Sequence, residues 1–210
     1  LKPSIIFLEN VKNLQSHDEG RTFKIIKSEL EDRGYFLNYK VLNSAEYGNV
    51  PQNRERIYIV GFKDKNVFEK FRFPKQKKLN VKITDLLEKQ ADEYFYYHKS
   101  KYYPQLKEEM TNKDTVYQWR RKYVRENKSN LCPTLTANMG TGGHNVPLII
   151  DSKDIRKMTP RECARFQGYD ENFIFSENMA NSHLYKQIGN SVTVSVIEAI
   201  AKEIRKALDV

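Results

Sequence analysis

Four polar side chains next to predicted strands are candidates for an active site. Glu9 closes the apolar run SIIFLE, and active-site residues of open α/β sheets collect at such strand ends. Gln52, Arg54 and Arg56 follow Pro51 in a polar stretch just before a second apolar run. A carboxyl group can give or take a proton, and a guanidinium offers a permanent charge with planar donors. An ordinary strand-end carboxylate and a solvated polar turn are the plainer interpretations of the same residues.

Cysteine chemistry is restricted to two residues, Cys132 and Cys163. Two are too few for a disulfide framework or a zinc site, so we expect no metal centre and a reducing, cytoplasmic compartment. No run approaches the ~18 apolar residues of a membrane span, so we expect no membrane partner.

The charge of the chain favours a polyanionic partner. The 210 residues include 36 lysines and arginines against 27 aspartates and glutamates, a net charge of +9. Residues 63–128 hold 18 of these basic side chains against 10 acidic ones, interleaved with tyrosines and Trp119. Singly, the aromatic side chains are expected to form a small core. The collective charge imbalance predicts binding of DNA.

Within residues 63–128, we expect basic side chains to contact the DNA. A glycine-rich turn over residues 138–145 follows this segment in the sequence. Glycine lets a backbone approach a ligand closely, although three glycines outside a strand–helix setting are a weak phosphate-loop signal. We interpret the turn as a recognition loop. The predicted contacts are Arg120, Arg121, Lys122, Arg125, Gly142 and Gly143.

Apolar runs and capping signals predict an α/β fold. Residues 4–9 have the pattern of a strand covered on both faces, as in a parallel sheet, and residues 35–42 and 57–62 are two further strands. A capping box of Ser16 with Glu19 predicts a helix that ends at Gly34.

Two more helices are expected towards the end of the chain. Thr159, Pro160 and Glu162 form a strong helix start, and Gly168 ends that helix. Ser191 can cap the last helix, whose apolar face is predicted from helical spacing. That face comprises Ile197, Ile200, Ala201, Ile204 and Leu208.

Four motifs, in this order, resemble the later motifs of the DNA (cytosine-5)-methyltransferases. They are ENV at 9–11, QNRER at 52–56, TPRECARFQG at 159–168 and GNSV at 189–192. One of them alone would mean little, but the ordered set is specific. A variable basic insert separates the second motif from the third. The chain is therefore identified as a member of this family.

The resemblance implies an α/β fold: an incomplete, Rossmann-like methyltransferase sheet with a small target-recognition domain. Residues 1–63 would be catalytic-domain strands, 64–180 the recognition domain, and 181–210 a C-terminal helix returning to the catalytic domain. S-adenosylmethionine would donate a methyl group to C5 of a flipped cytosine in a specific site of double-stranded DNA. The setting would be a bacterial restriction-modification system, in the cytoplasm and associated with the nucleoid.

The resemblance also implies roles at the base. Cytosine C6 is a poor electrophile, so attack by a cysteine needs positive charge or protonation at N3. Glu9 would hold N3 and the exocyclic amine. Arg56 would contact the base O2 and help to order the catalytic loop, while Arg54 and Gln52 would support that site or the DNA phosphates.

Three further residues match family positions outside the base site. Asn190 and Ser191 would belong to the S-adenosylmethionine pocket. Thr134 would contact a phosphate that flanks the flipped base.

Two family motifs have no counterpart in the sequence: the Pro-Cys-Gln nucleophile and the glycine-rich cofactor loop. Cys132 precedes Pro133, and Cys163 lies inside a predicted helix. We therefore expect the C-terminal part of an enzyme, inactive alone. It would be a truncated or cleaved piece, or one subunit of a split methyltransferase whose partner carries the missing half.

An alternative is a catalytically inert DNA-binding module on a methyltransferase scaffold, although retention of both Glu9 and Arg56 argues against it. An amino-methyltransferase is set aside, because that class needs a Pro-Pro motif and the chain has none.

Overall fold

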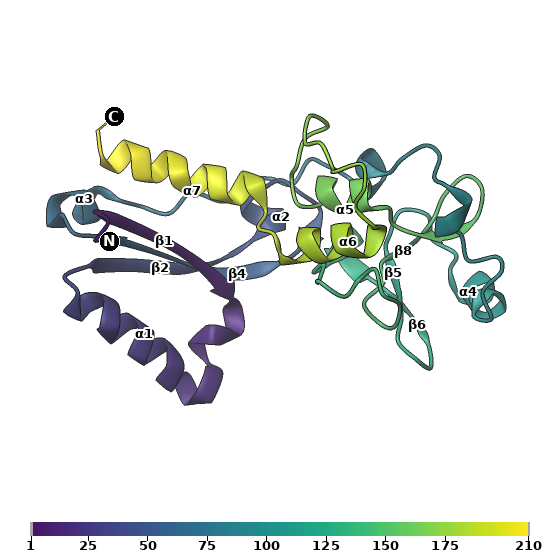
Figure 1. Ribbon diagram of the computed structural model, residues 1–210, viewed down its shortest axis with the longest axis horizontal. Coiled ribbons are helices and arrows are strands. Elements are labelled where there is room, and N and C mark those ends of the chain that lie inside the picture. The colour runs from purple at the N-terminus through teal and green to yellow at the C-terminus, as the bar shows by residue number, and fades with distance from the viewer. Residues whose placement is uncertain (1, 210) are drawn as a thin grey trace.

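A computed structural model describes residues 2–209 and shows an elongated molecule (Figure 1). One end is a three-stranded sheet between two long helices. The other end holds short strands, short helices and long connections. Both termini lie at the sheet end, so the chain runs out to the second part and returns.

The sheet comprises β1 (Ile5–Val11), β2 (Phe36–Asn43) and β4 (Glu55–Phe62) in the order β1-β4-β2. Strand β4 runs antiparallel to both neighbours, so β1 and β2 are parallel to each other. The prediction that residues 4–9 are buried on both faces of a parallel sheet is wrong for the described residues. There β1 pairs only with β4, and every residue of β1 is exposed or half-buried.

Helix α1 (Arg21–Asp32) covers one face of the sheet (Figure 1). It begins after Gly20, so the predicted capping box of Ser16 and Glu19 is wrong. The 3-10 helices η1 (Lys12–Gln15) and η2 (His17–Gly20) occupy that stretch, and Glu19 has a left-handed φ of 55°, which a third helical residue cannot have. The predicted end at Gly34 is confirmed. Its φ is 82°, and the Tyr35 N–H reaches back to the Leu30 carbonyl.

Helix α7 (Val194–Ala207) covers the other face (Figure 1). Its Val196 and Ile200 pack into a core with Tyr58 and Val60 of β4, and α3 (Lys65–Lys70) closes the end of this core. The apolar face predicted for this helix is partly wrong, because Ala201 is exposed.

Two other expectations for this helix are also corrected. Leu208 is 40% exposed at its end. Thr193 precedes the helix as its N-cap residue, and the Ser191 hydroxyl instead donates to the Ile188 carbonyl, so Ser191 does not cap α7.

The second part is built around a four-stranded antiparallel sheet, β6-β5-β8-β9, and around the parallel pair β3–β7 that links it to the first part. The remaining elements are α2 (Ser44–Tyr47), β3 (Gln52–Asn53), η3 (Ile83–Leu86), η4 (Glu93–Phe95), α4 (Tyr103–Glu109), β5 (Tyr117–Trp119), β6 (Val124–Glu126), η5 (Lys128–Asn130), β7 (Cys132–Pro133), β8 (Leu148–Ile150), β9 (Ile155–Lys157), α5 (Pro160–Arg165) and α6 (Asn181–Asn190).

Aromatic side chains of the basic segment mostly form small cores, as expected of them singly. Phe95 and Tyr117 are buried, and Trp119 is partly buried against the β5–β8 core. Tyr94 and Tyr102 remain on the surface, 62% and 38% exposed.

The predicted start of α5 is confirmed. The Thr159 hydroxyl accepts the Glu162 N–H, and the Glu162 carboxylate accepts the Thr159 N–H. Gly168 follows with a φ of 78°, and the Tyr169 N–H bonds to the Ala164 carbonyl, which ends the helix as predicted.

Glu162 also belongs to a buried ionic network that local sequence signals did not reveal. Its carboxylate accepts two bonds from the Arg156 guanidinium, at 2.7 and 2.8 Å, and Arg156 Nε donates to Asp151 at 2.5 Å. Burial alone would lower the pKa of Arg156, but Glu162 and Asp151 outweigh burial and raise it. Burial opposes ionisation of Asp151, yet hydrogen bonds from Asp154 N–H and Arg156 hold its pKa below 3.8.

Candidate active site and DNA-binding cleft

Glu9 and Arg56 meet on one face of the sheet at the end of β1. Register pairs Glu9 with Tyr58 and Val11 with Arg56, so the two charged side chains lie diagonally across neighbouring strands. Arg56 Nε lies 3.1 Å from Glu9 Oε1, and the two side chains are 14% and 24% exposed. The structure thus brings together the carboxylate and the guanidinium that the sequence singled out.

The Glu9 oxygen nearest Arg56 makes an ion pair but no hydrogen bond with the described residues. This atom, Oε1, is shielded from solvent and has no geometrically sound donor in the described part of the chain. Burial and the charge of Glu9 both raise the pKa of Tyr58, its partner across the strands, so this phenol stays protonated. A buried oxygen without a donor is costly, and a ligand N–H would satisfy it.

Arg54, between β3 and β4, lies away from the surface, so it does not occupy the catalytic position that we expected for it. Its side chain is 3% exposed, and it donates to the Leu135 carbonyl at 2.9 Å and to the Ser191 carbonyl at 2.6 Å. Burial, followed by repulsion from Arg56, lowers its pKa from 12.5 to about 10. Arg54 therefore ties the sheet to the segments that carry Thr134 and Asn190.

Gln52 is fully buried, which corrects its expected contact with DNA. Its amide donates to the Phe166 carbonyl at 2.6 Å and accepts the Leu135 N–H at 3.1 Å. Together with Arg54, it holds the junction between the two parts of the molecule.

Thr134, Asn190 and Ser191 lie around this junction. The Thr134 hydroxyl is half-buried and donates to the Asn53 carbonyl at 2.7 Å. The Asn190 side chain is exposed at the end of α6 and makes no hydrogen bond with another described residue. The Ser191 hydroxyl donates a hydrogen bond to the Ile188 carbonyl. Of the two predicted cofactor residues, only Asn190 has a free side chain.

A basic cleft of about 670 Å³ runs between the β5–β6 hairpin and the β3–β7 junction. Arg120 and Arg125 line one wall, and Asn53 and Thr134 line the other. Arg121 and Lys122 lie fully on the surface at the hairpin turn beside the cleft.

The structure therefore groups five of the predicted DNA contacts: Arg120, Arg121, Lys122, Arg125 and Thr134. Tyr123, 55% exposed at the same turn, also lines the cleft. Tyr123 was not among the predicted contacts, although its position among four basic residues in the sequence could have indicated that it contacts DNA.

Gly142 and Gly143 lie apart from this cleft, although the same turn reaches it through Asn145. Both have left-handed backbones, with φ of 94° and 81°, and apart from their chain neighbours no described residue comes within 4 Å of where a Cβ would stand. The Arg120 guanidinium donates to the His144 carbonyl at 3.4 Å, which ties the turn to the hairpin.

Neither cysteine is available as a nucleophile in this structure. Cys132 and Cys163 are both fully buried, and burial raises the pKa of each thiol. The thiolate is the reactive form, so both are inert in the folded chain. No described residues form a cluster of His, Cys, Asp or Glu that would suit a metal ion, and none of the described helices is long and apolar enough to cross a membrane.

Comparison with known proteins identifies the family. A sequence model of the C-5 cytosine-specific DNA methylases matches residues 1–206. Type II methyltransferase M.Bsp6I of Bacillus sp. (strain RFL6) is 58% identical over 99% of this chain and 67% of its own length. M.SsoII of Shigella sonnei is 39% identical over 99% of this chain and 54% of its own length. M.HhaI of Haemophilus parahaemolyticus is 34% identical, with 65% of its length covered.

Solved structures agree on the fold. The S. pombe Dnmt2 methyltransferase superposes over 99% of this chain and 66% of its own, with a TM-score of 0.74 at 21% identity. The Entamoeba histolytica methyltransferase EhMeth gives the same TM-score at 18% identity. The chain spans between about half and two thirds of the length of the curated relatives named above. It has a methyltransferase-type α/β fold and belongs to the C-5 cytosine-specific DNA methylases.

Proposed function

We propose that this chain supplies the base-edge acid, the DNA cleft and part of the methyl-donor site of a DNA (cytosine-5)-methyltransferase of a bacterial restriction-modification system. The observation that carries the proposal is the ion pair of Glu9 with Arg56, in which the buried Glu9 Oε1 accepts no hydrogen bond from the described residues. The named bacterial relatives support the family setting. We keep 1–63, 64–180 and 181–210 as the proposed division of the sequence, although α3 packs on the sheet and α6 packs on α5.

The role of Glu9 follows from the chemistry of the cytosine ring. When a thiolate adds to C6, the electron pair of the C5=C6 bond shifts towards N3 and C5 becomes nucleophilic. A carboxyl group at N3 stabilises that charge, and its second oxygen can accept a hydrogen bond from the exocyclic amine. Glu9 Oε1 lies 3.1 Å from Arg56 Nε but accepts no hydrogen bond from any described residue, so it keeps an acceptor for this contact.

Arg56 holds Glu9 in place and offers N–H donors to the base. Its Nε lies at the Glu9 carboxylate, and its Nη1 donates to the Glu55 carbonyl. The guanidinium keeps its charge throughout the reaction, so it stabilises negative charge at the base O2 without a proton transfer.

S-adenosylmethionine would supply the methyl group at C5. Asn190 fits a place in its site, because its exposed amide has no other partner among the described residues. Arg54 holds the carbonyls of the neighbouring residues Gly189 and Ser191, and so fixes the backbone on which Asn190 sits.

Double-stranded DNA would bind along the basic cleft, with the hairpin turn against its backbone. Charge reversal of Lys122 and Arg125 should weaken duplex binding and flatten its salt dependence, because each phosphate contact releases counterions. Reversing Lys24 and Lys27 on α1 serves as a matched control of equal charge change. Equal binding by the two double variants, or affinity that does not change with salt, would contradict this assignment.

The nucleophile would come from another segment of polypeptide, because both thiols of this chain are buried. The chain alone should therefore transfer no methyl group. We would mix it with a segment carrying the glycine-rich and Pro-Cys-Gln motifs, and follow tritium transfer from S-adenosylmethionine to duplex DNA. Activity of the mixture supports the proposal. Activity of this chain alone, with no second polypeptide detected by mass, would overturn it, and DNA binding without transfer by the mixture would favour the inert binding module.

A further inference from the structure

A second pocket lies on the opposite face of β5 from the basic cleft. Neighbouring side chains of a strand point to opposite faces, so Gln118 lines the cleft while Trp119 lines this pocket. We call it the aromatic pocket. Its volume is about 320 Å³, and its principal lining residues are Tyr94, Tyr97, Tyr102, Trp119, Gly142 and Lys157.

Aromatic rings with exposed surface form its walls. The centroids of the Tyr102 and Trp119 rings lie 5.1 Å apart, with an interplanar angle of 36°. Tyr102 is 38% exposed and Tyr94 is 62% exposed. Large rings held in place but left open to solvent are suited to stacking on a planar ligand.

Lys157 decides the charge of that ligand. Its ammonium lies 4.2 Å from the centroid of the Tyr94 ring, and it forms no ion pair with any described residue. An aromatic cage without such a group would bind cations, but a second cation here would be repelled. The pocket therefore favours a planar group that carries negative charge.

The glycine-rich turn adds donors at the rim. The backbone N–H groups of Gly142 and Gly143 make no hydrogen bond within the part of the chain that the structure describes. Successive unpaired N–H groups in a left-handed turn attract anions. They lie at the same pocket as the Lys157 ammonium.

We propose that the aromatic pocket binds one unstacked nucleotide, with its base against Tyr102 and Trp119 and its phosphate near Lys157. The volume suits a single nucleotide and is too small for a duplex. This goes beyond the proposed function, because it assigns a second nucleic-acid site, for an unpaired base, on the face of the hairpin away from the basic cleft. It does not depend on methyl transfer, so either inference can fail alone.

Trp119 is the single tryptophan of the chain, so its fluorescence reports directly on the pocket. We would titrate the chain with thymidine 5′-monophosphate, exciting at the red edge of indole absorption, where the nucleotide does not absorb. The probe contains no adenine, which keeps the methyl-donor site out of the measurement. We expect saturable quenching by this nucleotide, and none by deoxyribose 5-phosphate or inorganic phosphate at equal concentration.

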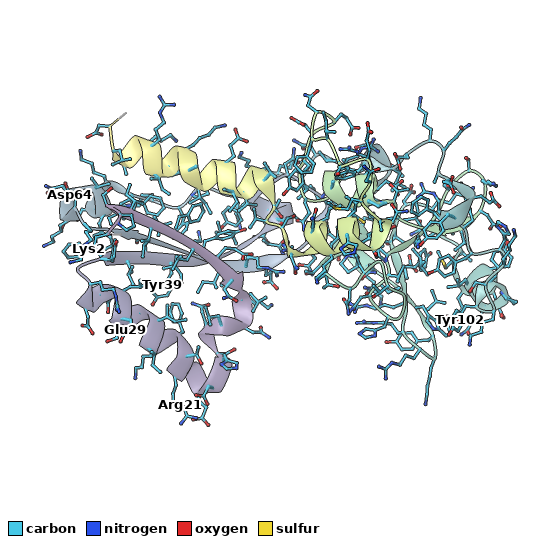
Figure 2. The ribbon with its side chains drawn as sticks, viewed as in Figure 1. Lys2, Arg21, Glu29, Tyr39, Asp64 and Tyr102 are labelled. Atoms are coloured by element: carbon cyan, nitrogen blue, oxygen red, sulfur yellow. The ribbon has the colours of Figure 1, made fainter. Side chains whose placement is uncertain are left out.

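Variants test the two halves of the pocket. Tyr102→Ala should weaken binding by about 5- to 150-fold, since stacking of a base on an aromatic ring contributes about 1–3 kcal/mol, and Tyr102→Phe should restore it. Lys157→Gln should weaken binding and remove most of its salt dependence, because salt screens the attraction between the ammonium and the phosphate. Tyr39→Ala is the matched control, because Tyr39 is 40% exposed and lies in the sheet at the other end of the molecule (Figure 2).

Three results would overturn the proposal. Quenching by deoxyribose 5-phosphate equal to that by the nucleotide would indicate an anion site without base recognition. Stronger quenching by tetramethylammonium would indicate a cation cage. Wild-type affinity in both Tyr102→Ala and Lys157→Gln would show that the pocket is not where the nucleotide binds.

Discussion

Replacing Arg54 by alanine should destabilise the fold, although Arg54 belongs to the same motif as the catalytic candidate Arg56. The buried Leu135 carbonyl and the half-buried Ser191 carbonyl, which accept from Arg54 at 2.9 and 2.6 Å, would lose their donor. Each unsatisfied acceptor costs about 1–3 kcal/mol, and loss of the buried aliphatic stem adds about 2 kcal/mol.

The burial of the charge acts in the opposite direction. The pKa of Arg54 falls from 12.5 to about 10. At ~1.4 kcal/mol per pKa unit, removing the buried charge stabilises the fold by on the order of 3 kcal/mol. The expected net loss in the free energy of unfolding is therefore about 3 kcal/mol.

Arg56→Ala is the matched control for this prediction. Arg56 makes one ion pair and one hydrogen bond to a carbonyl, so its removal should cost less than that of Arg54, about 1–2 kcal/mol, while it lowers turnover in an assembled enzyme. Urea unfolding followed by circular dichroism measures both variants. Equal stabilities for Arg54→Ala and Arg56→Ala would refute the structural role that we assign to Arg54.

Three further predictions concern the buried network and the thiols. Glu162→Gln should lower the free energy of unfolding by up to about 3–5 kcal/mol, because it removes one of the two carboxylates that compensate the buried Arg156 charge and leaves only Asp151; urea titration measures this. The pKa of Asp151 lies below its usual value of 3.8, so the ionised carboxylate stabilises the fold at higher pH, and this stabilisation is lost as the pH falls. The urea midpoint should therefore fall less steeply on acidification in Asp151→Asn than in the unchanged chain. Cys132 and Cys163 should not react with a thiol reagent in the native chain, whereas both should react in urea.

Local signals in the sequence predicted the local structure correctly where a few neighbouring residues decide it. The capping box at Thr159 and the left-handed glycines Gly34 and Gly168 are examples, because their hydrogen bonds close within one turn. The capping box predicted for Ser16 and Glu19 is wrong, because residues outside that short pattern decide the structure there. The chain there turns through 3-10 segments before α1, and no local pattern marked them.

Burial at the site could not be predicted from the motif alone. Gln52 and Arg54 have the composition of a solvated turn, but their partners Phe166 and Leu135 lie 114 and 81 residues further along the chain. Glu9 and Arg56 lie together because antiparallel pairing of β1 with β4 places them on one face, a pairing that we did not predict from the sequence. The aromatic pocket likewise joins Tyr102, β5 and the glycine turn, which only tertiary packing brings together.

The role of Glu9 is tested most directly by single-turnover methyl transfer with Glu9→Gln. The variant chain would be combined with the segment that carries the nucleophile, and tritium transfer from S-adenosylmethionine to a duplex would be followed beside duplex affinity. We predict a fall in rate of about 10²- to 10⁴-fold with unchanged affinity, because the carboxyl acts on the activated ring and not on the duplex. A normal single-turnover rate in the Glu9→Gln enzyme would contradict the account.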